Sequence, residues 1–303
     1  MSKFRIGYFA DGPWSHKAFE LLQEDESLEI CFIVPRTDSN DETLRNFATE
    51  YVIDYLKPVR VNSAQFRDEV NKYDCDLFVS MSFNQIFKKE TIEIPRLDTI
   101  NCHAGKLPFY RGRNVLNWAI INDEDEFGIT VHFVDEGIDT GDIILQDTYP
   151  ILENDDYGTI LKKAYKGCSE LLYESVKKLQ EGVYERIEQD TIHPVGFYCG
   201  GRQLGDEIID WNKSSREIFN FIRALADPGP KATTFKKGKT IKINRSKLIE
   251  NAPSYKNIPG QILKKTKEGY LVKTKDTFIE IKEIETDISL KVGDRFETGS
   301  LKE

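Results

Sequence analysis

Short apolar strands alternate with helical segments through the first half of the chain, and this alternation restricts the fold more than any other feature. Strands that are separated by helices pair mainly in parallel, and the helices cover the sheet. The sequence therefore predicts an α/β domain with a mostly parallel sheet. The predicted strands are 4–10, 28–34, 76–82, 99–103, 129–134 and 143–149, and the predicted helices are 15–23, 42–54, 65–73, 114–122 and 156–180.

The pattern changes after Gly200 and Gly201. One helix is predicted at 214–225, where Ser214 and Glu217 have the spacing of a capping box. Short alternating strands follow, which are typical of a small antiparallel sheet or barrel. We therefore expect a first domain at residues 1–204, and a helical connection with a smaller β domain at 205–303. The predicted strands of that domain are 240–243, 260–263, 270–274 and 278–284.

Composition argues for a folded protein. Hydrophobic residues make up 39% of the 303 residues, and no apolar run reaches the roughly 18 residues of a membrane span. Residues 1–12 lack the pattern of a secretory signal, so we expect a cytoplasmic protein without membrane association. The five cysteines are widely spaced and the four histidines show no ligand spacing, so we expect free thiols and no metal.

Charge is distributed unevenly. The formal net charge is −9, yet residues 231–282 hold 14 Lys and Arg against 4 Asp and Glu. Such a basic block can bind nucleic acid, although it is more often the solvated face of a small β domain. Charge alone therefore leaves the partner open.

The loop after the first predicted strand lacks the common nucleotide-binding motifs. Residues 10–16 contain neither a P-loop nor G-x-G-x-x-G. The loop still precedes a helix N-terminus, whose free N–H groups suit a phosphate. Ser15 and His16 can contact such a group, or Ser15 can cap the helix while His16 lies on the surface.

Two polar segments carry the residue types of a catalytic site. Asn101 and His103 are two residues apart on a predicted strand, so their side chains share one face and Cys102 points into the other layer. They stand at the end of the strand where open α/β sheets bind ligands. The second segment, residues 134–142, is an acidic loop with glycines between two strands.

Together these segments resemble the folate-dependent formyltransferases, over about residues 1–200 and through Asp210-Trp211 into the second domain. The resemblance implies a Rossmann-like formyltransferase domain followed by an OB-like β domain. It also implies 10-formyltetrahydrofolate as formyl donor, a primary amine as acceptor, and Asn101, His103 and Asp139 as catalytic residues. The matching motifs are Asn101-x-His103, Leu107-Pro108, Arg111-Gly112, Trp118-Ala119 and Gly137-x-Asp139-Thr140-Gly141-Asp142.

The three residue types suit formyl transfer. Attack of an amine on the formyl carbon builds negative charge on oxygen and positive charge on nitrogen. Asn101 and a protonated His103 can donate hydrogen bonds to the oxygen. A neutral His103, or a water held by Asp139, can accept the proton.

The resemblance also implies a folate site. The loop after the strand at 76–82 matches the family's pterin-binding loop in position, and its apolar residues are equally compatible with core packing. The predicted folate-binding residues are Phe83, Asn84, Gln85, Ile86, Phe87, Val134, Asp135 and Gly137.

Two acceptors compete, an aminoacyl-tRNA and an amino sugar carried on a nucleotide. The basic block and the OB-like domain favour methionyl-tRNA formyltransferase. Against it, residues 35–43 are short and acidic where the tRNA enzymes have a long basic loop, and the residues that follow His103 and Arg111 look like those of the sugar enzymes. A binding protein without activity is disfavoured because all three catalytic residues are present.

We therefore predict a nucleotide-sugar partner and no nucleic acid. The expected reaction is N-formylation of an amino sugar such as dTDP-4-amino-4,6-dideoxyglucose, for cell-surface polysaccharide (O-antigen) synthesis. Basic residues suit the diphosphate and aromatic residues suit the base, although Lys106 and Tyr110 can equally have structural roles. The likeness to sugar enzymes implies a homodimer. The predicted substrate-binding residues are Trp14, Ser15, His16, Lys106, Tyr110 and Arg113.

Overall fold

The computed structural model describes residues 2–298 and divides the chain into two compact units. The first unit comprises residues 2–112, 127–149 and 162–199. The second comprises residues 113–126, 150–161 and 200–298. The boundary expected between residues 204 and 205 stays a prediction, because a unit defined by contacts is not a test of which segment folds alone.

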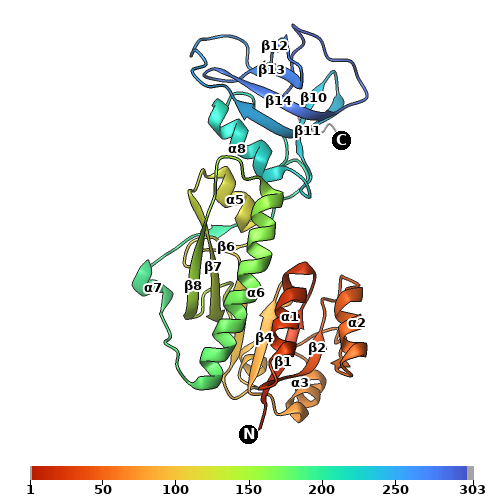
Figure 1. The fold of residues 1–303 in the computed structure, drawn as a ribbon, viewed down its shortest axis with the longest axis vertical. Helices are drawn as coiled ribbons and strands as arrows, with labels where there is room; N and C mark the ends of the chain where they lie inside the picture. Colours follow the sequence, from red (N-terminus) through yellow and green to blue (C-terminus); the bar gives the residue numbers. More distant parts are fainter. Residues whose placement is uncertain (1, 299–303) are drawn as a thin grey trace. The chain divides into compact units, whose positions relative to one another are not determined.

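A seven-stranded sheet with the order β3-β2-β1-β4-β5-β7-β8 forms the first unit (Figure 1). Strands β1 to β5 run parallel, and β7 pairs antiparallel with β5. A separate two-stranded sheet joins β6 (Arg111–Gly112) to β9 (Tyr198–Cys199). The main strands are β1 (Phe4–Ala10), β2 (Leu28–Val34), β3 (Asp54–Tyr55), β4 (Leu77–Met81), β5 (Thr99–His103), β7 (Glu126–Phe133) and β8 (Ile143–Pro150).

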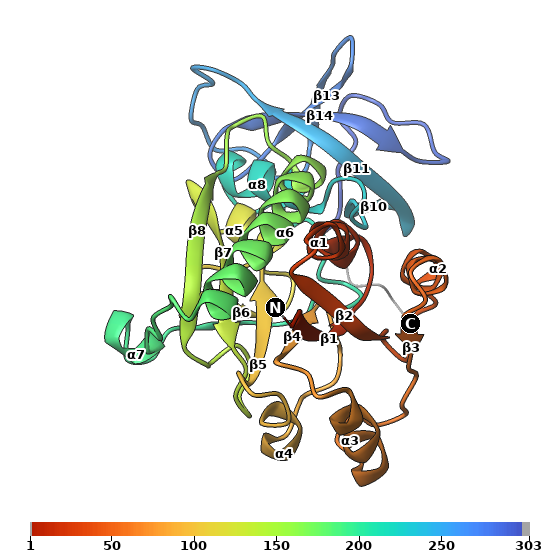
Figure 2. The same cartoon turned by 60° about the horizontal axis from the view of Figure 1, so that its bottom comes forward.

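Helices cover both faces of this sheet. On one face Trp14 of α1 packs edge-on against Tyr165 of α6, with ring centroids 4.7 Å apart, and the two helices lie side by side (Figure 2). On the other face α3 adds Phe66 to a buried cluster that includes Phe9 and Phe87. The helices are α1 (Pro13–Glu24), α2 (Glu42–Glu50), α3 (Ala64–Val70), η1 (Asn71–Tyr73), α4 (Lys89–Ile92), α6 (Tyr157–Glu181) and α7 (Gln189–Ile192).

In the second unit a helix packs on a five-stranded antiparallel sheet with the order β10-β11-β14-β13-β12. Its core contains Trp211 and the apolar stripe of α8, represented by Ile218 and Ile222. The Trp211 indole donates a hydrogen bond to Thr234 Oγ1 at 2.9 Å, so its polar atom is satisfied. The elements are α5 (Val115–Ile121), α8 (Ser215–Leu225), β10 (Ala232–Lys236), β11 (Lys239–Leu248), β12 (Ile262–Lys265), β13 (Gly269–Lys273) and β14 (Phe278–Glu285).

The predicted fold class is confirmed, and the differences are local. The helix expected at 42–54 ends at Glu50, because Val52 takes a left-handed φ of 57° that no helix continues through. Strand β10 was not predicted, since a Thr-rich segment between lysines has no clear apolar alternation. Pairing with β11 makes it a strand.

All five cysteines are free thiols. Within residues 2–298, no helix combines the length and the apolar character that crossing a membrane requires.

The start of α8 predicts a measurable contribution to stability. Ser214 Oγ accepts a hydrogen bond from the Glu217 N–H, and Glu217 accepts one from the Ser214 N–H at 2.9 Å. We expect Ser214→Ala to lower the free energy of unfolding by about 1 kcal/mol, measured by urea unfolding. Ser289→Ala, at an exposed serine outside any helix, serves as control; equal losses in both variants would refute the capping role.

Candidate active site

Strand β5 carries the first two predicted catalytic residues to the carboxyl edge of the parallel strands. Asn101 lies opposite Ser80 of β4 and opposite His132 of β7 in the sheet register. Cys102 points to the α6 side, where its thiol lies 3.6 Å from the Cys168 carbonyl. Asn101 and His103 therefore face away from α6, as the alternation along a strand requires.

The loop after β7 brings Asp139 to the histidine. His103 Nδ1 lies 3.6 Å from Asp139 Oδ2, and both side chains are largely buried. The opposite ring nitrogen, His103 Nε2, lies 2.7 Å from the Tyr110 carbonyl. Since a carbonyl only accepts hydrogen bonds, Nε2 carries a hydrogen, and Nδ1 is the nitrogen that faces the carboxylate.

Gly105 is required for this contact. A Cβ at this position would lie 2.4 Å from His103 Nε2 and 2.5 Å from the Tyr110 carbonyl oxygen. Any side chain would therefore push apart the two atoms that set the orientation of the ring.

His132 also belongs to the site, although the sequence analysis gave it no role. Its Nδ1 donates to the Phe133 carbonyl at 2.7 Å, so in the neutral ring Nε2 is an acceptor. Asn101 Nδ2 lies 3.2 Å from that Nε2, which orients the amide with its NH₂ toward the ring. His132 Nε2 is also 3.6 Å from Asp139 Oδ1. A single imidazole on an otherwise apolar strand beside the acidic loop was the signal that could have revealed it.

Asp139 is a charged group in a buried position. Burial alone would raise its pKa, but the positive charge that His103 and His132 carry when protonated and a 2.9 Å hydrogen bond from the Gly112 N–H stabilise the carboxylate. Together they hold the pKa of Asp139 well below its ordinary value. The group is therefore ionised at neutral pH.

The two segments of the predicted folate site meet beside the sheet. The rings of Phe83 and Phe87 stack with centroids 5.7 Å apart, and Phe9 packs edge-on against both. Val134 packs against the same cluster. Phe87 lies fully in the core. This position agrees with the other interpretation of the loop, in which its apolar residues pack in the core.

Two polar atoms of this loop are buried without a hydrogen-bond partner in the described part of the chain. Among the described residues, no donor reaches the buried Asn84 Oδ1 and no acceptor reaches the buried Gln85 Nε2. The Gln85 carbonyl oxygen Oε1 accepts from the Val61 N–H at 3.1 Å, which anchors the loop. Unpaired polar atoms beside an apolar cluster fit a pterin ring, which is flat and rich in hydrogen-bonding groups.

On the acidic loop, Asp135 Oδ1 accepts hydrogen bonds from the Gly137 N–H and the Thr140 hydroxyl, at 3.0 and 2.6 Å. These contacts shape the turn that leads to Asp139. The folate roles of Asp135 and Gly137 stay predictions.

The predicted substrate-binding residues at the start of α1 are engaged within the protein. Ser15 is buried and its hydroxyl donates to the Gly12 carbonyl, so it neither caps the helix nor reaches the surface. His16 contacts Asp41 at 2.8 Å, and Trp14 packs on α6.

The remaining predicted substrate contacts are spread over both units. Tyr110 is buried with its ring against Phe197, and its carbonyl rather than its ring reaches His103. Lys106 follows β5 and lies against Gly128. Arg113 belongs to the second unit, where its side chain lies beside Gly201.

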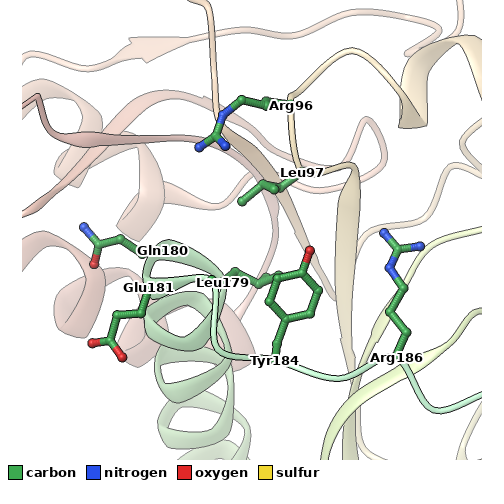
Figure 3. Close-up of a pocket in the computed structure, with 8 residues that line it drawn as sticks. Arg96, Leu97, Leu179, Gln180, Glu181, Tyr184 and Arg186 are labelled. Carbon is green, nitrogen blue, oxygen red and sulfur yellow. The ribbon is translucent and has the colours of Figure 1, made fainter.

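A pocket of about 530 Å³ in the first unit lies away from these residues (Figure 3). Arg96 and Leu97 line it just before β5 begins, at the opposite end of that strand from His103. Its two arginines, Arg96 and Arg186, already pair with Asp76 and Asp98 at 2.8 Å. The pocket is therefore separate from the catalytic candidates, and both of its arginines are compensated by carboxylates.

Sequence comparison identifies the family. Residues 16–176 match the Formyl transferase family, and residues 203–292 match the Formyl transferase C-terminal domain. The chain belongs to the formyl transferase family. It is a formyltransferase, and the prediction of 10-formyltetrahydrofolate as formyl donor is confirmed by this membership.

Individual relatives resolve the class further. The methionyl-tRNA formyltransferase of Clostridioides difficile (strain 630) is 34% identical over 86% of this chain and 85% of its own length. That of Acetivibrio thermocellus is 31% identical over 95% and 94%. In fold, the chain is similar to an N-formyltransferase from Helicobacter canadensis that was solved with folinic acid and dTDP-3-aminofucose. The TM-score is 0.70, with 23% identity over 94% of this chain and 100% of the other.

These relatives correct the predicted acceptor. The expectation of a nucleotide-sugar partner, no nucleic acid and a role in polysaccharide synthesis is wrong, because relatives at 31–34% identity over most of the chain are methionyl-tRNA formyltransferases. The sugar enzymes are similar only at the level of fold. The prediction relied on a few residues around His103 and Arg111, and not on the similarity over the whole chain. The expected homodimer and cytoplasmic location stay predictions.

The lowered pKa of Asp139 predicts a pH dependence of stability. A carboxyl whose pKa is lower in the folded than in the unfolded chain stabilises the fold fully above its unfolded pKa of about 4, and this stabilisation is lost as the pH falls through the folded pKa. We expect the unfolding free energy of the wild type, relative to Asp139→Asn, to decrease as the pH falls below about 4. Urea unfolding at a series of pH values measures it. An increase over the same range would contradict the burial of a stabilised carboxylate.

Proposed function

We propose that this protein transfers the formyl group of 10-formyltetrahydrofolate to the amino group of methionyl-tRNA. The observation that carries the proposal is the identity of 31–34% with methionyl-tRNA formyltransferases over both the catalytic and the C-terminal parts of the chain. The reaction develops negative charge on the formyl oxygen and positive charge on the attacking nitrogen. The residues around Asp139 can stabilise both charges.

Asn101 stabilises the oxygen. One N–H of its amide is held by His132 Nε2 at 3.2 Å, and the other is left to donate to the formyl oxygen as negative charge builds there. Because the ring of His132 is fixed by the Phe133 carbonyl, the donor is oriented before the substrate arrives.

His103 accepts and returns the proton, and Asp139 stabilises the protonated ring. With Nε2 donating to the Tyr110 carbonyl, the neutral ring presents the lone pair of Nδ1, which accepts the proton that the attacking amine loses. The imidazolium formed in this way faces the Asp139 carboxylate at 3.6 Å and is stabilised by it. The reverse transfer from Nδ1 supplies a proton to the leaving folate nitrogen.

The folate site proposed for the pterin ring is the loop after β4. The unpaired Asn84 Oδ1 would accept a hydrogen bond from the ring and the unpaired Gln85 Nε2 would donate one to it, and the cluster of Phe83 and Val134 would cover its apolar face. When bound, 10-formyltetrahydrofolate would supply the formyl group, and these residues would orient it.

The β domain carries positive charge that tRNA can use. Part of the basic block is neutralised within the domain, where Lys231 pairs with Glu285, Lys236 with Asp294 and Lys282 with Glu268. On β12, Lys264 and Lys265 are exposed, and no acidic side chain of the described residues forms an ion pair with them. Such lysines increase the affinity of a protein for nucleic acid, because they neutralise phosphates.

Variants of the three catalytic candidates test the mechanism. Because each group acts on the same transition state, we expect Asn101→Ala, His103→Asn and Asp139→Asn each to lower turnover with methionyl-tRNA by about 100-fold or more, and less than additively in combination. Release of tetrahydrofolate measures turnover. Glu136→Gln removes an exposed carboxylate three residues from Asp139 and serves as control; near-normal turnover of any of the three variants removes that residue from the mechanism.

Charge reversal tests the acceptor. We expect the double variant Lys264→Glu/Lys265→Glu to weaken tRNA binding and to reduce the slope of log K against log salt concentration by about 2, because two phosphate contacts are lost. The control Lys3→Glu/Lys72→Glu makes the same change in net charge at exposed residues of the first unit. A wild-type protein that binds and formylates no methionyl-tRNA would overturn the proposed acceptor.

A further inference from the structure

A single buried glutamine lies beside the acidic loop. Gln189 begins the short helix α7, and its side chain is buried with an exposed fraction of 3%, whereas its neighbours Glu188 and Asp190 are exposed. A buried amide must find partners for two donors and an acceptor. Its partners are therefore informative.

Every hydrogen-bonding position of this amide is used. Gln189 Oε1 accepts from Arg111 Nε at 3.0 Å and from Arg111 Nη2 at 2.7 Å. Its Nε2 donates to the carbonyl oxygens of Asp139 at 2.9 Å and Gly141 at 2.8 Å. Because a guanidinium only donates and a carbonyl only accepts, this orientation of the amide is the only one that satisfies all four contacts.

Arg111 is itself held in place. It is buried, donates to the Val195 carbonyl at 3.3 Å, and its guanidinium lies 5.3 Å from the centre of the Tyr198 ring. The next residue, Gly112, donates its N–H to the Asp139 carboxylate. Strand β6 thus contacts Asp139 twice, directly at the carboxylate and through Gln189 at the main chain.

Asp139 needs such support. It has a φ of 55°, a left-handed conformation that costs a residue with a Cβ free energy and persists only where surrounding contacts hold it. The loop is also tight at Gly141, where a Cβ would lie 1.9 Å from the Phe133 carbonyl oxygen. Without the two hydrogen bonds from Gln189, the carbonyls of Asp139 and Gly141 would lose these partners.

We propose that Gln189, anchored by Arg111, is a positioning residue that holds Asp139 at His103 and so sets the rate of formyl transfer. The inference rests on the proposed function, since it assumes that Asp139 acts in the reaction. Gln189 acts on the main chain at Asp139, whose carboxylate faces His103.

Gln189→Glu is the sharpest test. A carboxylate of the same size keeps the contact with Arg111 but cannot donate to the two carbonyls. We expect kcat to fall between about 10-fold and about 100-fold, with KM for the folate and for the acceptor within about threefold, because the loss is one of catalytic geometry. Asp190→Asn makes a change of similar size at the exposed neighbour and should leave kcat unaffected. Wild-type kcat in Gln189→Glu would refute the proposal.

Combination with Asp139→Asn separates positioning from general stability. If Gln189 acts through Asp139, adding Gln189→Glu to Asp139→Asn lowers kcat by less than about twofold. If its role is only structural, the two losses multiply, and the proposal fails. Should Gln189→Glu fold poorly, Arg111→Lys provides the same cycle, since a lysine cannot make the paired contact with Gln189 Oε1.

A readout without substrate distinguishes this inference from the proposed function. His103 Nδ1 and His132 Nε2 both lie 3.6 Å from the Asp139 carboxylate, so their ¹⁵N chemical shifts report its position. We expect Gln189→Glu to move both signals in the direction seen in Asp139→Asn, and Asp190→Asn to leave them in place. If these signals do not move, the inference is wrong even in an active enzyme. If they move but methionyl-tRNA is not formylated, the proposed acceptor is wrong and Gln189 still positions Asp139.

Discussion

A buried carboxylate between two imidazoles is the interaction on which the site depends. Asp139 stays ionised although burial opposes it, because the Gly112 N–H donates to it and the two imidazoles add positive charge beside it when they are protonated. The neighbouring groups are arranged around that charge: the ring of His103 is turned by the Tyr110 carbonyl so that Nδ1 faces it. A charge of this kind is costly unless its surroundings are rigid, which explains why the loop that carries it is tied down at several points.

The rigid surroundings come from the sheet. Asn101 and His103 are neighbours on one face of β5, and His132 lies on the antiparallel strand β7 directly opposite Asn101. Because β7 runs antiparallel to β5, its end at Phe133 lies opposite Ile100 near the start of β5, and the loop that follows has to reach back to bring Asp139 to His103.

A local motif and the whole chain indicate different acceptors for this protein. Residues after His103 and the short acidic segment after β2 look like those of sugar enzymes, and Arg36 of that segment pairs with Asp38 at 2.8 Å. Identity over both parts of the chain favours the tRNA enzymes instead. A few residues in a loop can change without altering the reaction, because the chemistry lies with the groups at the strand ends.

The sequence by itself determined the strand and helix alternation, the mostly parallel sheet, the small β domain and the pairing of Asn101 with His103 on one face. These follow from periodicity, which is local. It also carried the family motif that singled out Asp139. Only the tertiary structure decided that His132 and Asp139 share the site, that Ser15 is buried, and that Gln189, 50 residues after Asp139, holds its main chain. Contacts between residues far apart in the chain leave no periodic signal, since they depend on how strands pair and where loops return.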